Sequence, residues 1–354
     1  MRSAGSLIAN GLCWVLIATH GSAQASDEKA VKVFLLAGQS NMEGKAPTAL
    51  LNLQALAPAT KDQFAHLRTG DAFEVRQDVF IKYLTRHGPL SVGYGSPDRT
   101  GVEFEFGHML GEHFSEPVLL IKAAWGGHSL CKDFRPPSAG LPNAEVLAAE
   151  LAKAQKQVQA DNDKNHRNVP LPTYDDIRNQ YGASYRNMLS EVVETRNNLG
   201  TLFPELKGCK FELAGFVWFQ GWNDQYGGQD EYESNLKNLI HDLRRDVSAA
   251  HLPIVIAAMG QNGSKPAGGA LKMVQAAQMA MNDVPEFGGN VRSIRTDNLV
   301  DRAAEDLYPH WKEREKEWQV TGGDHPYHYF GSPIWFTRIG HAMGEAMLLL
   351  LPAK

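Results

Sequence analysis

The stretch VFLLAGQSNM, residues 33–42, runs from a continuous apolar segment directly into a Gly-Gln-Ser turn. A serine at the carboxyl end of a buried strand lies where open α/β sheets bind their ligands. If a helix begins at Asn41, its first N–H groups and the positive end of its dipole face the same crevice and favour an oxyanion there. Ser40 is therefore a candidate nucleophile, although this segment taken alone favours the commoner role of helix N-cap.

Apolar, strand-like segments alternate with helical patterns along the rest of the chain. This alternation predicts an α/β fold with a mostly parallel central sheet and helices on both faces. The expected strands are Val31–Ala37, Val118–Ala124, Phe211–Phe219, Ile254–Met259 and Val291–Ile294. The expected helices are Phe104–His113, Ala144–Gln159, Tyr185–Asn198, Glu231–Ala249, Leu271–Asn282 and Ile339–Leu351.

The first 25 residues have the pattern of a signal peptide. Arg2 provides the positive start, residues 7–18 are mostly apolar, and Ala23-Gln24-Ala25 provides a small-x-small cleavage site. The apolar stretch is shorter than the roughly 18 residues that a membrane span needs, so no stable membrane anchor is predicted. We expect cleavage near Ala25 and export to the periplasm or the extracellular space.

The mature chain, residues 26–354, has the pattern of one elaborated domain, without internal repeats or an inter-domain linker. Residues 133–181 depart from the α/β pattern because they are rich in Pro, Asn, Asp, Lys and Gln. We expect this segment to be a surface insertion with one helix of its own. Since it follows a strand end, we also expect it to overhang the active-site face.

Composition limits the kind of protein. A chain of 354 residues that is 43% hydrophobic and 21% charged can bury a sizeable core. The net charge of −5, without a long basic run, argues against nucleic acid as a partner. No CxxC pair, HExxH helix or EF-hand loop is present, so no metal site is predicted. Cys131 and Cys209 remain after signal cleavage, either as a disulfide or as two separate buried thiols.

Three further turns follow strands or precede helices. Asn223 and Gln220, in the segment QGWND, each have an amide that can donate a hydrogen bond to an oxyanion. Gly101 precedes a helix, where its backbone N–H is another candidate donor. Trp125-Gly126-Gly127 follows a third strand, and its glycine pair lets a ligand approach the backbone closely. Each segment taken alone is also typical of an ordinary turn.

A serine nucleophile needs a general base, which is most often histidine. The segment DHPYHYFGS, residues 324–332, places Asp324 beside His325 and His328 in a loop before the last helix. A carboxylate beside the base fixes its tautomer and stabilises the imidazolium. Either histidine in this segment is therefore a candidate base.

Together these segments resemble the characteristic blocks of SGNH-superfamily hydrolases, specifically the sialate O-acetylesterase-like carbohydrate esterases. The similar blocks follow the same order over nearly the whole mature chain. They are Gly38–Met42, the Gly101 segment, Ala124–Leu130, Gln220–Asp224 and Pro326–Ser332. The resemblance implies a three-layer α/β/α flavodoxin-like fold and a carbohydrate O-acetylesterase activity.

The resemblance also implies the roles of individual residues. Ser40 would be the nucleophile, and its backbone N–H would form an oxyanion hole with Gly101 and with either Asn223 or Gln220. His328, rather than His325, would be the base. Asp324 would be its acidic partner, although some SGNH enzymes orient the histidine through a backbone carbonyl instead.

The remaining expectations concern the substrate. Trp125 and Trp222, like Tyr329, lie beside the proposed catalytic blocks, where their rings are candidates to stack on sugars, and Gly126 and Gly127 would lie close to the substrate. The substrate would be an O-acetylated carbohydrate, either sialic acid or a plant or algal polysaccharide, and no cofactor is required. The alternative is a non-catalytic carbohydrate-binding relative of the same fold.

Overall fold

A seven-stranded sheet forms the centre of the molecule. The computed structural model describes residues 29–352, so the predicted signal peptide lies outside the described residues. The strands of the sheet are β1 (Ala30–Gly38), β5 (Val79–Tyr83), β6 (Arg86–Pro89), β8 (Val118–Ala124), β9 (Lys210–Phe219), β10 (Ile254–Ala258) and β11 (Val291–Arg295). They lie in the order β11-β10-β9-β1-β8-β5-β6, and only β5 and β6 pair antiparallel.

The strand order confirms the predicted flavodoxin-like fold. All five expected strands form, and their spatial order β8-β1-β9-β10-β11 is the 2-1-3-4-5 arrangement of flavodoxin-like sheets. The hairpin of β5 and β6 extends the sheet beyond β8 and was not predicted from the sequence. β6 is the sequence RHGP, and none of its residues is buried, so it has no hydrophobic pattern that distinguishes it from a loop.

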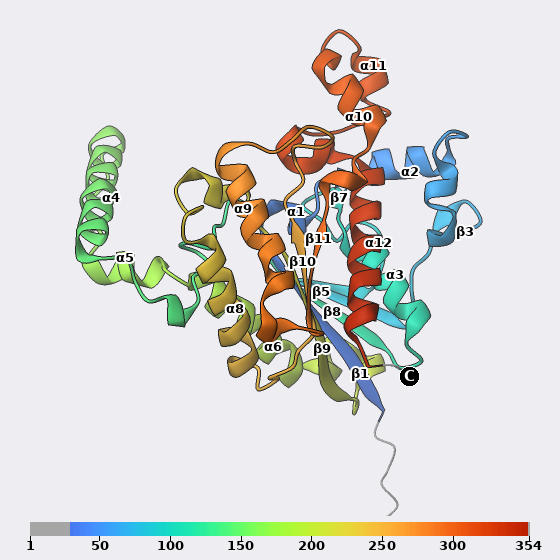
Figure 1. Ribbon diagram of the computed structural model, residues 1–354, viewed down its shortest axis with the longest axis horizontal. Coiled ribbons are helices and arrows are strands. Elements are labelled where there is room, and N and C mark those ends of the chain that lie inside the picture. The colour runs from blue at the N-terminus through green and yellow to red at the C-terminus, as the bar shows by residue number, and fades with distance from the viewer. Residues whose placement is uncertain (1–28, 353–354) are drawn as a thin grey trace, which may run out of the picture.

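Helices cover both faces of the sheet, which gives three layers (Figure 1). Along β1, Phe34 and Leu36 belong to one core, whereas Val33 and Leu35 belong to the other, and all four are fully buried. This alternation is the period of two of a strand that is covered on both sides. The helices of the first core are α3 (Glu103–His113) and α12 (Pro333–Leu350), and those of the second are α6 (Ala183–Asn197), α8 (Tyr232–Asp246) and α9 (Gly269–Met279).

Short elements connect the strands and helices, and those at the carboxyl edge of the sheet position the site. Among them, α1 (Ser40–Glu43) and the 3-10 segments η5 (Trp222–Tyr226) and η10 (Pro326–Gly331) carry predicted site residues. The other short helices and strands are β2 (Ala46–Pro47), α2 (Thr48–Leu56), β3 (Arg68–Thr69), β4 (Ala72–Phe73), β7 (Arg99–Thr100), α7 (Leu199–Leu202), α10 (Arg302–Leu307) and α11 (Glu315–Trp318).

The insertion differs from the sequence-based expectation in two respects. It carries two helices, α4 (Ala144–Asn165) and α5 (Tyr174–Gln180), instead of one. The two helices pack on each other through a small core of their own, formed by Leu147, Ile177 and Tyr181. The pair extends to one side of the sheet, away from α1, and therefore does not overhang the carboxyl edge of β1 (Figure 1).

Cys131 and Cys209 are both unpaired, so of the two alternatives the separate thiols are present. Burial raises the pKa of the Cys131 thiol to about 12, which keeps it protonated at neutral pH. Within residues 29–352, no helix is long and apolar enough to cross a membrane. The same residues contain no group of three or more His, Cys, Asp or Glu side chains placed to hold a metal ion.

Candidate active site

The candidate site lies where β1 and β9 end side by side. β8 lies on one side of β1 and β9 on the other, so the order of the strands reverses direction at β1. Open α/β sheets bind their ligands at such a topological switch point. A Cβ atom at Gly38 would lie 2.1 Å from the carbonyl oxygen of Phe219, so only glycine lets the two strand ends approach this closely. Ser40 follows β1 and Asn223 follows β9, which brings these two predicted residues to one crevice.

Ser40 is the first residue of the short helix α1, and only 8% of its surface is exposed. Gln39 occupies the N-cap position, so Ser40 does not act as the N-cap. The first N–H groups of a helix have no acceptor within the helix, and those of Ser40 and Asn41 belong to this set. Asn41 Nδ2 also donates to the carbonyl oxygen of Tyr327 at 3.1 Å, and this hydrogen bond joins the turn that contains Ser40 to η10.

His328, in η10, lies close to Asp324, two residues before η10 begins. His328 Nδ1 lies 3.2 Å from Asp324 Oδ2, although the pair is not aligned as a linear hydrogen bond. Burial by itself raises the pKa of Asp324, but the net pKa is lowered by His328, the backbone N–H of His325 and Arg99. The Arg99 guanidinium lies 3.6 Å from the carboxylate. Asp324 is therefore ionised at neutral pH and available to a protonated imidazole.

The other histidine of the segment faces a different group. His325 is exposed, its ring stacks on Tyr327 with centroids 5.2 Å apart, and its Nδ1 lies 3.0 Å from the Tyr308 hydroxyl. Its backbone N–H donates to Asp324 Oδ1 at 2.7 Å, so it supports the acid through its main chain. The geometry thus favours His328 over His325 as the partner of Asp324.

The backbone around His328 is unusual. Tyr329, Phe330 and Gly331 have φ values of 53°, 57° and 58°, a left-handed conformation that costs about 1–3 kcal/mol per non-glycine residue. Tyr329 is fully buried, and its hydroxyl accepts the Gly260 N–H at 2.9 Å and lies 3.0 Å from Thr296 Oγ1. Tyr329 therefore anchors the histidine loop in the core, and the expectation that its ring stacks on a sugar is wrong.

Gln39 fixes the orientation of the Asn223 amide. Its Oε1 accepts the backbone N–H groups of Gly221 at 3.2 Å and Asn223 at 3.3 Å, so this atom must be the oxygen. Its Nε2 then donates to Asn223 Oδ1 at 2.9 Å. With the oxygen of Asn223 occupied in this way, the Nδ2 group is the remaining donor of that side chain. Sequence reasoning missed Gln39, because a glutamine in a turn carries no signal of its own.

Gln220 is placed differently from Asn223. It is 2% exposed, and its Nε2 donates to Asp224 Oδ2 at 2.6 Å, to the His128 carbonyl oxygen at 3.1 Å and to Gln39 Oε1 at 3.2 Å. With its amide hydrogens engaged, Gln220 has none to offer an oxyanion, and its inclusion among the donors is wrong. Asp224 also accepts the N–H groups of Leu130 and Cys131, so it ties two of the predicted blocks together.

The expected role of Gly101 also needs correction. Its backbone N–H donates to Glu103 Oε1 at 2.8 Å, so it is not directed to an oxyanion in this structure. Glu103 in turn pairs with Lys122 at 2.8 Å, and both side chains are fully buried. Sequence reasoning missed this pair. The lysine within the apolar strand VLLIKAA was a visible signal, because a lysine buried in a strand requires a partner.

The Trp125-Gly126-Gly127 segment lies beside α1, the short helix that begins at Ser40. The Gly126 N–H donates to Glu43 Oε1 at 2.7 Å, and Glu43 is the last residue of α1. Burial by itself raises the pKa of Glu43, but Lys45, Gly126 and Ser96 lower it overall, so this contact is made by a carboxylate. Both glycines are exposed, whereas Trp125 is half-buried against His128 and Phe134. Substrate contact by the exposed glycines stays a prediction, whereas Trp125 packs against neighbouring side chains.

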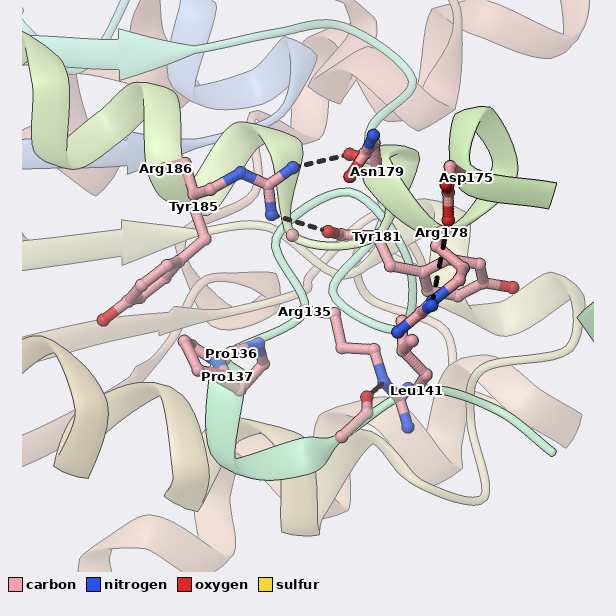
Figure 2. Close-up of a pocket in the computed structure, with 12 residues that line it drawn as sticks. Arg135, Pro136, Pro137, Leu141, Asp175, Arg178, Asn179, Tyr181, Tyr185 and Arg186 are labelled. Carbon is pink, nitrogen blue, oxygen red and sulfur yellow. Dashed lines mark hydrogen bonds and ion pairs between the residues drawn. The ribbon is translucent and has the colours of Figure 1, made fainter. Parts of the chain in front are cut away.

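A separate pocket of about 480 Å³ lies at the base of the insertion and contains none of the predicted site residues. Figure 2 shows that Arg186 is directed toward Asn179 and Tyr181, whereas Arg178 is directed toward the Asp175 carboxylate. Arg186 donates to the carbonyl oxygens of Tyr181 and Asn179, and Arg135 donates to that of Gly140. The Arg186 contacts join the end of α5 to α6. Because the pocket contains none of the predicted site residues, it is not the candidate active site.

Comparison with known proteins identifies the family of the chain. Residues 30–164 and 175–310 match the family described as carbohydrate esterase, sialic acid-specific acetylesterase. The chain belongs to this carbohydrate esterase family. The family match includes Ser40 and Asn223 but ends before Asp324 and His328, so it carries no information on the predicted roles of these two residues.

Two solved structures are similar to this chain. A protein from Arabidopsis thaliana is similar with a TM-score of 0.51 and 15% sequence identity, over 90% of this chain and 98% of its own. A carbohydrate acetylesterase from Xanthomonas citri is similar with a TM-score of 0.44 and 15% identity, over 89% of this chain and 55% of its own. No curated protein matches the chain significantly. At these identities the first likeness shows a shared fold alone.

The geometry predicts the effect of removing the Asn223 amide. Asn223→Ala is expected to lower kcat for an acetyl ester by about 100- to 1000-fold with little change in KM, because an oxyanion donor acts mainly in the transition state. Steady-state kinetics on p-nitrophenyl acetate measures both constants. Asn165→Ala, on the exposed face of α4, is the control. A folded Asn223→Ala protein with unchanged kcat would exclude this role.

Proposed function

We propose that the protein is an exported serine esterase that removes O-acetyl groups from a carbohydrate through an acetyl-serine intermediate. One observation supports the proposal: both neighbours of Ser40 are hydrogen-bonded to the other two segments of the candidate site, Asn41 to the Tyr327 carbonyl oxygen beside His328 and Gln39 to the Asn223 amide oxygen. This combination supplies a nucleophile, a base with its acid and an oxyanion donor. The carbohydrate esterase family supports the class of substrate.

In the first step, His328 takes the proton of the Ser40 hydroxyl as its oxygen attacks the acetyl carbonyl carbon. The negative charge that develops on the carbonyl oxygen is stabilised by the Ser40 N–H and by the Asn223 Nδ2 group. Asp324, held ionised by His328, the His325 N–H and Arg99, stabilises the imidazolium that forms. His328 then gives its proton to the departing sugar oxygen as the carbon–oxygen bond breaks.

In the second step, water attacks the acetyl-serine carbonyl while His328 accepts a proton from it. The same oxyanion donors stabilise the second tetrahedral intermediate. Its collapse releases acetate, and the proton returns to the Ser40 oxygen. Because every proton in this cycle passes through one imidazole, the mechanism needs no group beyond the side chains named.

The proposal includes export of the protein and two alternative types of substrate. The first 25 residues support export because of their signal-peptide pattern. The family description names sialic acid-specific acetylesterases, which supports an acetylated sugar as substrate. An acetylated sialic acid and an acetylated plant or algal polysaccharide are the two types to be tested.

The test combines a general ester assay with a glycan panel. The full mature chain is incubated with p-nitrophenyl acetate and, separately, with O-acetylated sialic acid and acetylated polysaccharides, and released acetate is measured. We expect turnover of the chromogenic ester and release of acetate from at least one glycan. Labelling by a fluorophosphonate, located by mass spectrometry, is expected at Ser40. A folded protein without turnover from neutral to mildly alkaline pH would support the non-catalytic, carbohydrate-binding alternative and overturn the proposal.

A further inference from the structure

Four aromatic side chains form a continuous series beside the candidate active site. The Tyr226 and Trp222 ring centroids are 6.3 Å apart, those of Trp222 and Tyr327 are 5.9 Å apart, and those of Tyr327 and His325 are 5.2 Å apart. We call these four residues the aromatic row. Because Trp222 and Tyr226 belong to η5 whereas His325 and Tyr327 lie in and before η10, the row crosses from one segment to the other.

Three of the four residues, Tyr226, His325 and Tyr327, are exposed, whereas Trp222 is partly buried against the core of the sheet. Tyr226 is 72% exposed and Tyr327 is 38% exposed. In residues 29–352, no protein group makes a hydrogen bond to either tyrosine hydroxyl or to the Trp222 indole N–H. Exposed aromatic residues that cluster on a folded protein commonly mark a binding surface. The rings offer apolar faces, and their polar ends remain available to hydroxyl groups.

Both segments of the row also carry the catalytic groups. Asn223 is the residue after Trp222, and the Tyr327 ring lies 4.5 Å, centroid to centroid, from the ring of His328. The Tyr327 carbonyl oxygen is bonded to Asn41, next to the nucleophile. A substrate that covers the row therefore lies beside both Asn223 and His328.

We propose that the aromatic row binds successive rings of a linear oligosaccharide or polysaccharide, whose acetyl group enters the site between Asn223 and His328. This inference rests on the proposed esterase function and specifies its substrate as a chain of sugars. The apolar faces of pyranose rings stack on aromatic rings, while their equatorial hydroxyls reach polar groups at the edges. A monosaccharide would cover one or two of these rings, so a row of four fits a longer ligand.

The experiment measures how kcat/KM depends on chain length. The substrates are chemically acetylated β-1,4-linked xylo-, gluco- and manno-oligosaccharides of one, two, four and six rings. In the wild-type protein, kcat/KM is expected to rise from the one-ring to the six-ring substrate of at least one series. Tyr226→Ala is expected to reduce the six-ring to one-ring ratio by about threefold to tenfold, the worth of one aromatic contact. We compare ratios because kcat/KM on the one-ring substrate measures any effect of the substitution on the catalytic step itself. Dividing by it leaves the effect on binding of the additional rings.

Two variants test whether the ring itself is responsible. Tyr226→Phe keeps the ring and is expected to retain most of the length dependence. Tyr174→Ala removes a tyrosine that is 39% exposed at the start of α5, outside the row, and is expected to leave the ratio unchanged. An equal fall in the Tyr174→Ala and Tyr226→Ala ratios would overturn the proposal.

The outcomes separate this inference from the proposed function. If the wild type hydrolyses p-nitrophenyl acetate but kcat/KM does not rise with length in any series, the row is not a glycan site and the esterase function stands. If the wild type hydrolyses no ester, the esterase function fails, and binding of the six-ring oligosaccharides by tryptophan fluorescence decides the inference. Binding that Tyr226→Ala weakens would support the row, and absence of binding would overturn it.

Discussion

Ser40→Ala is expected to lower kcat/KM on p-nitrophenyl acetate by at least about 10⁴-fold, the loss that follows removal of a serine nucleophile. Ser40 lies at the end of β1 beside both the oxyanion donor and the histidine loop, so no other hydroxyl takes its place. The residual rate would come from the oxyanion donors and from binding alone. Steady-state kinetics at equal concentrations of folded protein, with folding checked by circular dichroism, measures the loss.

Companion variants make this result specific. Ser234→Ala removes an exposed serine of α8 and is expected to keep full activity. His328→Ala is expected to cost about as much as Ser40→Ala, and the double variant little more, because the two act as one unit. Asp324→Asn is expected to cost less than either, since the acid only supports the base. A folded Ser40→Ala protein with more than a tenth of wild-type activity would refute the nucleophile assignment.

The core of the fold was predictable from the sequence because burial on both faces of a parallel sheet leaves long apolar runs. The run VFLLAG forms β1, VLLIKAA forms β8, and the weaker run after Val291 forms β11. Within the β5–β6 hairpin, the fully buried run VFIKY of β5 was a visible signal that sequence reasoning missed. Only β6 lacked a signal, because an exposed edge strand such as RHGP has no pattern to preserve. The position of the insertion was equally hidden, since composition indicates a loop-rich segment but not the direction in which it extends.

The sequence predicts the residues of the candidate site but not its hydrogen bonding. Ser40 and Asn223 were predicted from strand-end positions, Asp324 and His328 from a loop before the last helix, and their roles, which come from the motif resemblance, stay predictions. The choice between Asn223 and Gln220 depends on which amide hydrogens are already engaged, and only the contacts of Gln39 and Asp224 decide it. In the same way, the Gly101 N–H is a plausible donor in sequence, but Glu103 occupies it in the structure.

Lys122→Met is expected to reduce the free energy of unfolding by about 3–5 kcal/mol, the cost of breaking a buried ion pair. Lys122 and Glu103 are both fully buried, and the ammonium group uses its three hydrogens on Glu103 Oε2, the Glu43 carbonyl oxygen and the Tyr94 carbonyl oxygen. Methionine of similar length leaves the Glu103 carboxylate without its cation and leaves two carbonyls without a donor. Guanidinium chloride unfolding measures the change.

The same variant connects stability with the site, because Lys122 contacts the Glu43 carbonyl oxygen at the end of α1 and supports Glu103 beneath Gly101. Lys237→Met, which breaks the exposed pair with Glu233, is the control and is expected to cost less than about 1 kcal/mol. The double variant Lys122→Met/Glu103→Gln removes the unpaired charge and is expected to recover part of the loss. If Lys122→Met unfolds at the same guanidinium concentration as Lys237→Met, the buried pair does not hold the nucleophile turn, and the rigidity of α1 must come from its strand contacts alone.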